Sequence, residues 1–218
     1  MIEKQITPSI LNVEKNNRQA IVNKLLNMGI KWFHFDVMDN QFVPNTALEV
    51  DEIISLQSKS SKKFAFDVHL MVENPWEYAK QLIDYATCIT VHYESFKTEK
   101  EIVDFVNEFS HHCWIGIAIK PSTKFEQIQN ILYLFDLVLI MGVEPGFGGQ
   151  TFIDNTLDKV KEIKEFIDTE KLTTLIQVDG GINDKNSKSI FEAGSTFNVV
   201  GSYLIKNIDD SKTLNKLK

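Results

Sequence analysis

Short apolar runs alternate with amphipathic stretches from one end of the chain to the other. The apolar runs have the length of buried strands. They predict strands over residues 5–11, 32–38, 64–71, 88–92, 114–119, 137–141, 174–178 and 196–200. The amphipathic stretches have the helical period, and in residues 152–168 apolar side chains recur at positions 153, 157, 160, 163 and 167.

Residue types at the ends of these stretches support the same division. Gly29 closes a predicted helix over residues 16–28, and Gly194 follows one over residues 186–193. Asn74 and Pro75 have the residue types of an N-cap and a first helical position. The chain is therefore expected to alternate strands and helices throughout.

This alternation predicts a parallel α/β fold. Eight strands in 218 residues leave about 27 residues for each strand–helix unit, which fits a compact eightfold barrel. No linker or low-complexity segment interrupts the pattern, so we expect a single TIM (β/α)8-barrel domain over residues 1–218. An open doubly wound sheet is the rival, but polar strand-end residues occur on several strands instead of gathering at one switch point.

Three of the predicted strands carry ionisable side chains among apolar ones: FHFDVMD (33–39), FDVHLM (66–71) and QVDGGI (177–182). Side chains two apart share a strand face, so His34 lies beside Asp36, and Asp67 lies beside His69. Burial of such groups is costly unless they are paired or bound to a metal. Because function collects at the carboxyl ends of barrel strands, these side chains are expected to converge there.

We predict one metal site formed by His34, Asp36, His69 and Asp179. Two imidazoles and two carboxylates suit one divalent ion, namely zinc, iron, manganese or cobalt. Asp67 lies deeper on its strand and is expected to be a hydrogen-bond partner or a structural residue. His92, at the end of another strand, is interpreted as structural.

Two carboxylates beside one metal also suit proton abstraction next to a carbonyl. Asp36 and Asp179 come from nearly opposite strands of a ring of eight, so one could remove a proton while the other delivers one to the opposite face. Met38, Met71 and Met141 end three strands on inward positions. They are either core filler or an apolar floor that excludes water from an intermediate.

Glycine-rich strings follow the last three predicted strands: EPGFGGQ (144–150), DGGI (179–182) and VGS (200–202). Loops at these places in a barrel often bind phosphate through backbone N–H groups and a helix N-terminus. None of the three strings contains Lys or Arg. A phosphate would therefore be held by amides and by helix dipoles, each worth about 0.3–1 kcal/mol.

Composition narrows the choice of partners. The net charge of −7 argues against nonspecific binding of nucleic acid, which needs a basic surface. The apolar runs are shorter than a membrane span, and no signal peptide precedes residues 2–11, so we expect a cytoplasmic protein that does not enter a membrane. Cys88 and Cys113 are expected to be reduced thiols. The sequence leaves the oligomeric state open, including a homo-oligomer.

Taken together, these strings resemble the ribulose-phosphate 3-epimerase family. The matching segments are TPSIL (7–11), HFDVMDNQFVPN (34–45), FDVHLMVENP (66–75), ITVHYES (89–95), MGVEPGFGGQTFI (141–153), VDGGIN (178–183) and VGS (200–202). The resemblance implies a TIM barrel that interconverts D-ribulose 5-phosphate and D-xylulose 5-phosphate through an enediolate, a step of the pentose phosphate pathway. It implies one divalent metal on the four residues above, with Asp36 and Asp179 also serving as the acid–base pair.

The resemblance also implies how a small phosphorylated ketose would be held. Ser9 and His69 would contact the sugar. The phosphate end would be formed by Gly146, Phe147, Gly148, Gly149, Gly180, Gly181, Gly201 and Ser202. Three positions depart from the family: Asn40 replaces Gly, Gly142 replaces Ser or Thr, and Lys120 replaces Asn. Asn tolerates left-handed backbone geometry, so we expect the turn at Asn40 to survive.

Three other functions compete with this interpretation. A sister epimerase would act on a six-carbon ketose phosphate such as D-allulose 6-phosphate; the DGGI string favours the pentose enzyme. A phosphate-binding decarboxylase or aldol-type barrel relies on an Asp-x-Lys pair, whereas this chain has Asp67-Val68-His69. A non-catalytic phosphosugar-binding barrel would not need both Asp36 and Asp179.

Overall fold

The computed structural model describes residues 3–218, and in them eight strands form one parallel sheet. The strands are β1 (Gln5–Pro8), β2 (Trp32–Met38), β3 (Ala65–Met71), β4 (Cys88–His92), β5 (Trp114–Ile119), β6 (Leu137–Met141), β7 (Leu175–Asp179) and β8 (Phe197–Val200). Hydrogen-bonded neighbours follow the order β1-β8-β7-β6-β5-β4-β3-β2, and one isolated parallel bridge between Ser9 and His34 joins β1 to β2. The sheet is therefore a near-closed barrel, and the predicted TIM-barrel fold is confirmed.

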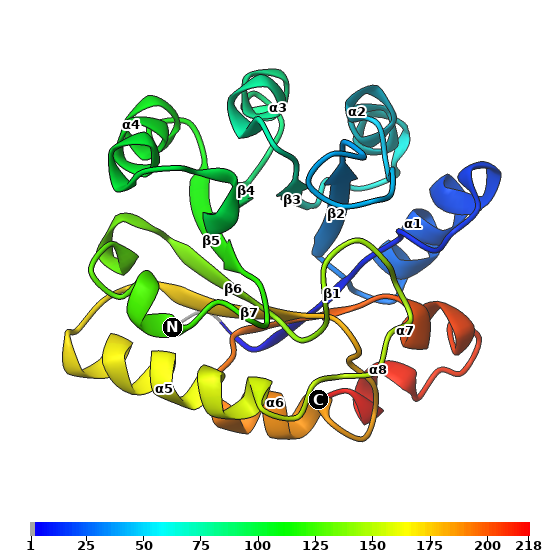
Figure 1. Ribbon diagram of the computed structural model, residues 1–218. Helices are drawn as coiled ribbons and strands as arrows, with labels where there is room; N and C mark the ends of the chain where they lie inside the picture. Colours follow the sequence, from blue (N-terminus) through cyan, green and yellow to red (C-terminus); the bar gives the residue numbers. More distant parts are fainter. Residues whose placement is uncertain (1–2) are drawn as a thin grey trace.

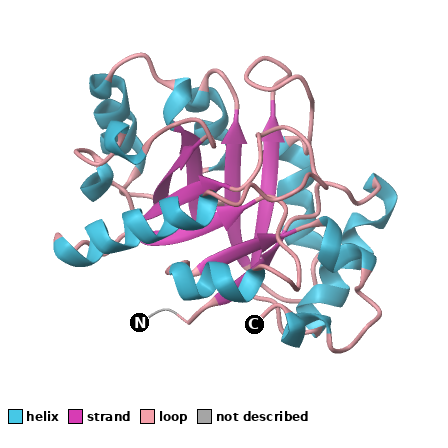
Figure 2. Ribbon diagram, turned by 60° about the horizontal axis from the view of Figure 1, so that its bottom comes forward, coloured by secondary structure: helices cyan, strands magenta, loops and turns pink. Residues whose placement is uncertain are grey.

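Helices surround this sheet on its outer side (Figures 1 and 2). They are α1 (Arg18–Asn27), α2 (Val50–Lys59), α3 (Pro75–Leu82), α4 (Glu99–Phe109), α5 (Thr156–Thr169), α6 (Ser187–Ala193), α7 (Ser202–Lys206) and α8 (Thr213–Lys216). Between β5 and β6 the chain forms only two 3₁₀ turns, η3 (Phe125–Gln127) and η4 (Leu132–Leu134), so the alternation is incomplete there. Among the described residues, no helix is both long and apolar enough to span a lipid bilayer.

Most predicted boundaries lie within one or two residues of the observed ones, with two larger differences. The strand predicted over residues 5–11 ends at Pro8, followed only by the bridge at Ser9. The helix predicted from residue 152 begins at Thr156, because the Ile153 N–H donates to the Gly142 carbonyl at 2.9 Å and this holds the segment in a loop. Gly194 ends α6 with a φ of 127°, as its residue type predicted.

The barrel interior is filled at the amino ends of the strands and left open at the carboxyl ends. The Trp32 ring centroid lies 5.7 Å from that of Trp114 and 5.0 Å from that of Phe197. Around them pack the buried side chains of Cys88, Ala118, Leu137, Leu139 and Met141. Polar inward positions occur above this aromatic layer, toward the end where barrel active sites form.

Candidate active site

The period of two along β2 and β3 directs a buried polar cluster into the barrel. His34 and Asp36 alternate with core residues on β2, and Asp67 and His69 do so at adjacent register positions on β3. Asp179 ends β7, three strands from β2 around the ring. One ligand atom from each of four residues lies within 4.8 Å of all the others: His34, Asp36, His69 and Asp179.

The two imidazoles face the same pair of carboxylates. His34 Nε2 lies 3.5 Å from Asp36 Oδ1 and 3.8 Å from Asp179 Oδ2. His69 Nδ1 lies 3.5 Å from Asp36 Oδ1 and 3.9 Å from Asp179 Oδ2. Each nitrogen thus stands at nearly equal distances from two carboxylate oxygens, an arrangement in which one cation could contact all four groups.

Two buried ring nitrogens support a metal at this position. Within residues 3–218, neither His34 Nε2 nor His69 Nδ1 has a hydrogen-bond partner. A buried polar atom without a partner is costly, and a cation bound between these nitrogens would supply one. The set of two nitrogens and two carboxylates, without thiolates, suits a divalent transition metal. The four residues could therefore hold such an ion.

Neighbouring residues outside the four make hydrogen bonds to three of these side chains, those of His34, Asp36 and His69. Asp67 Oδ2 lies 2.8 Å from His34 Nδ1 and also accepts from Gln177 Nε2 at 2.6 Å, so Asp67 is a hydrogen-bond partner of the cluster. Ser9 Oγ donates to Asp36 Oδ2 at 2.7 Å. His92, interpreted as structural from the sequence, is buried with Nε2 only 2.9 Å from Nε2 of His69.

Burial and mutual charge separate the pKa values of the cluster. Burial opposes the charged form of His34, but the carboxylates of Asp67 and Asp36 outweigh it and hold the pKa of His34 well above its usual range. Burial lowers the pKa of His69 to about 4. Burial raises the pKa of Asp179 to about 7, with Asp36 contributing repulsion.

Asp36 shows the opposite behaviour from Asp179. Burial alone would raise its pKa, but the charge on His34 outweighs burial and lowers the pKa of Asp36 below its usual range. One carboxyl group is therefore ionised while the other titrates near neutrality. Pairs of titratable groups whose pKa values are pushed apart are typical of an acid and a base that act together.

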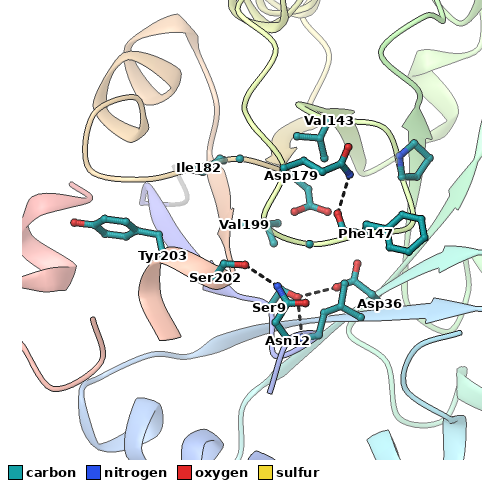
Figure 3. Close-up of a pocket in the computed structure, with 18 of the residues that line it drawn as sticks. Ser9, Asn12, Asp36, Val143, Phe147, Asp179, Ile182, Val199, Ser202 and Tyr203 are labelled. Carbon is teal, nitrogen blue, oxygen red and sulfur yellow. Dashed lines mark hydrogen bonds between the residues drawn. The ribbon is translucent and has the colours of Figure 1, made fainter. Parts of the chain in front are cut away.

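A cavity of about 290 Å³ opens above the cluster at the carboxyl ends of the strands. Asp36 and Asp179 line it, and Figure 3 shows both beside this pocket. All the expected sugar- and phosphate-contacting residues except His69 line it as well: Ser9, Gly146, Phe147, Gly148, Gly149, Gly180, Gly181, Gly201 and Ser202. His34 and His69 are fully buried and are not among the lining residues.

The three strand-end methionines form part of the cavity wall. Met38, Met71 and Met141 all line it and are nearly buried. Met38 and Met71 also pack with Val43, while Met141 packs with the interior layer below. Their two possible roles, shielding an intermediate from water and filling the core, stay predictions.

Two glycines of these strings lie too close to other chain segments to carry a side chain. A Cβ at Gly181, whose φ is +69°, would lie 2.5 Å from the backbone nitrogen of Phe152. A Cβ at Gly148 would lie 2.3 Å from Asn12 Nδ2. Asn12 Nδ2 in turn donates to Ser202 Oγ at 2.6 Å, so segments after β1, β6 and β8 meet at one end of the cavity (Figure 3).

Two lining residues, Asn12 and Lys206, were not predicted from the sequence. Asn12 follows β1 outside any glycine string, and Lys206 is the last residue of the short helix α7. Lys206 supplies a cation to a cavity whose three glycine strings contain none. Only the position of these two segments, after β1 and after β8, could have suggested them.

The positions that depart from the family pattern have local explanations. Asn40 has a φ of 59°, so the expected left-handed turn is confirmed. Lys120 Nζ lies 4.1 Å from the centre of the Phe42 ring, a cation–π contact. At Gly142, a Cβ would lie 2.7 Å from the Gly180 carbonyl oxygen, so this chain leaves no room for a side chain there.

Comparison with known proteins agrees with this geometry. The model of the ribulose-phosphate 3-epimerase family matches residues 5–205. The ribulose-phosphate 3-epimerase of Schizosaccharomyces pombe is 36% identical over 204 residues, covering 93% of this chain and 87% of that protein. The enzyme of the same name from Aquifex aeolicus is 32% identical over 216 residues, covering 99% and 96%.

Solved structures with low sequence identity share the fold. A crystal structure of 3-hexulose-6-phosphate synthase superimposes with a TM-score of 0.67 at 13% identity, covering 98% of this chain and 97% of that one. Thiamine phosphate pyrophosphorylase from Pyrococcus furiosus gives 0.61 at 15% identity, covering 98% and 93%. At such identities the likeness concerns the barrel alone.

The fold and the site together define a (β/α)8-barrel protein with a candidate metal centre below a cavity lined by glycine-rich loops. Within this class, the match to the family model and the similarity to relatives over nearly the full length identify the family. The chain belongs to the ribulose-phosphate 3-epimerase family.

Proposed function

We propose that this protein is a metal-dependent epimerase that interconverts D-ribulose 5-phosphate and D-xylulose 5-phosphate by inverting C3. The observation that carries the proposal is the pair formed by Asp36 and Asp179, which face the same two imidazoles and line the same cavity. A non-catalytic sugar-binding barrel would not need two carboxylates with separated pKa values beside one candidate metal centre.

The two carboxylates divide the proton transfers. Asp36, ionised and held by the Ser9 hydroxyl, takes the C3 proton from one face of the substrate. Asp179, with a pKa of about 7, holds a proton that it delivers to the opposite face. The roles reverse in the opposite direction of reaction. A bound divalent ion would polarise the adjacent carbonyl and offset the negative charge of the enediolate.

The phosphate end of the substrate is assigned to the loops after β6, β7 and β8. Gly148, Gly181 and Gly201 allow the backbone to approach a ligand closely. Lys206, a lining residue on α7, adds one positive charge at this end. Backbone N–H groups of these loops would supply most of the donors, since the three glycine strings carry no cationic side chain.

Gly201→Ala is expected to raise the KM for the phosphorylated substrate by about tenfold or more, the scale of one misplaced methyl group in a binding pocket. The added Cβ would meet only Ser9 atoms, at 3.5 Å and beyond, so the protein itself accommodates it. Steady-state kinetics measures the effect, and thermal unfolding checks that the fold is intact. An unchanged KM would contradict a phosphate pocket at Gly201.

A coupled assay that compares D-ribulose 5-phosphate, D-allulose 6-phosphate and free D-ribulose tests the proposed function directly. We expect the highest kcat/KM for the pentose phosphate and very poor use of the free sugar. Preference for the hexose phosphate would assign the protein to the sister activity, and turnover of none of them would favour a binding role.

A further inference from the structure

A chain of hydrogen bonds runs behind His69, away from the carboxylate pair. His69 Nε2 lies 2.9 Å from Nε2 of His92, and His92 Nδ1 lies 3.0 Å from Glu94 Oε2. His92 ends β4 and is fully buried, while Glu94 lies in the following 3₁₀ turn η2 (Tyr93–Ser95). Neither residue is among those that line the cavity.

The carboxylate at the end of this chain fixes the direction of every hydrogen bond in it. A carboxylate only accepts, so His92 must carry its proton on Nδ1. At neutral pH an ordinary imidazole is mostly uncharged and has one N–H, so His92 Nε2 is then an acceptor. The donor to it is the Nε2–H of His69. His69 Nδ1 is consequently left without a proton, and this is the nitrogen that faces Asp36 and Asp179.

Glu94 is itself held firmly in this orientation. Its other oxygen, Oε1, accepts from the backbone N–H of Lys120 at 2.9 Å and from the hydroxyl of Thr123. The ring of Phe42 packs against His92 with centroids 4.8 Å apart. The chain of hydrogen bonds therefore ends at the segment after β5, and the Phe42 ring covers His92.

We propose that His92 and Glu94 are positioning residues of the metal centre, because they keep the proton of His69 on Nε2 and so present Nδ1 to the ion. This rests on the metal centre of the proposed function. His34 is arranged in the same way by a shorter route: Asp67 accepts from its Nδ1, and Nε2 faces the ion position. Each imidazole thus depends on its own carboxylate for the choice of ligand nitrogen.

Glu94→Gln tests the proposal with almost no change in shape. The glutamine carbonyl must replace Oε1, because the Lys120 N–H and the Thr123 hydroxyl there need an acceptor. Its NH₂ group then donates to His92 Nδ1, which reverses the chain and places the proton of His69 on Nδ1. We expect the affinity for Co²⁺ to fall by about 10–100-fold, the range seen when such partners of metal ligands are lost.

The imidazole tautomers provide a readout independent of metal and of turnover. In metal-free protein, long-range ¹H–¹⁵N NMR spectra are expected to show the Nε2–H form of His69 in the wild type and the Nδ1–H form in Glu94→Gln. Thr123→Val is the matched control, because it removes a contact of Glu94 without removing the acceptor for His92. We expect Thr123→Val to keep the wild-type tautomer and nearly the wild-type Co²⁺ affinity.

A second variant, His92→Phe, removes the acceptor for His69 and is expected to give mixed tautomers and weaker Co²⁺ binding. It serves as the test if Glu94→Gln does not fold. Wild-type tautomer and affinity in the folded variant would overturn the role of His92 and Glu94. Failure of the wild-type protein to bind Co²⁺ would instead reject the metal centre itself, so the two outcomes are distinct.

Discussion

Asp179→Asn is expected to lower the rate of epimerisation by about 10²–10⁴-fold, the usual range for loss of one acid–base group. Asparagine keeps the shape of the side chain but cannot donate or accept the transferred proton. Asp179 is the more accessible member of the pair, with 16% of its side chain exposed against 4% for Asp36. Because Asp179 acts in the proton transfer itself, the loss should appear in kcat more than in KM.

The metal content of the variant must be measured together with its rate, because Asp179 also belongs to the candidate metal centre. Asp154→Asn, at an exposed position before α5, is the matched control and should leave the rate unchanged. With two groups acting on opposite faces, wild-type turnover in D₂O should place deuterium at C3 of the product. Near-normal epimerisation by metal-loaded Asp179→Asn would exclude Asp179 as the second acid–base group.

Removal of metal by a strong chelator is expected to abolish turnover, and zinc, manganese or cobalt should restore it. Without an ion, His34 Nε2 and His69 Nδ1 are buried polar atoms that lack partners among the described residues. Without the ion, the enediolate would also lose the polarisation and the divalent positive charge that a bound metal supplies. Assays before and after dialysis measure the effect, and circular dichroism checks that the chelated protein is folded. Full activity in metal-free protein would refute the assignment.

The same centre sets the direction of the pH dependence of metal binding. The pKa of His34 is raised well above its usual range, so the metal-free protein holds a proton there at neutral pH. Binding of an ion must displace this proton. Metal affinity should therefore rise as pH increases and fall in acid.

The sequence was sufficient where the chemistry follows from strand periodicity. The period of two put His34 beside Asp36 and Asp67 beside His69 before any fold was known, and in the structure β2 has the predicted bounds. β3 begins one residue later than predicted. The helix α5 was placed too early because Phe152 and Ile153 continue the apolar period although their backbone belongs to the loop after β6.

The contacts behind the site could not be read in this way. Glu94 reaches Thr123 and the backbone of Lys120, about one strand–helix unit further along the chain, and no periodicity relates these positions. Asn12 meets Ser202 across 190 residues. The Asn12–Ser202 contact depends on the closure of the barrel, which brings the first and last segments together, whereas Glu94 meets its partners because β4 and β5 are neighbours in the sheet.

The barrel is closed only weakly between β1 and β2. β1 is paired to β8 over four residues, but toward β2 the described part of the chain, residues 3–218, shows only the bridge between Ser9 and His34. The hydrogen bond from the Ser9 hydroxyl to Asp36 also crosses this gap between β1 and β2. An ion bound by His34 and Asp36 together with Asp179 would connect β2 to β7, which lies on the other side of this gap beyond β1 and β8. Metal occupancy and resistance of the barrel to opening would therefore be linked, because the binding free energy of the ion would also oppose separation of β2 from β7.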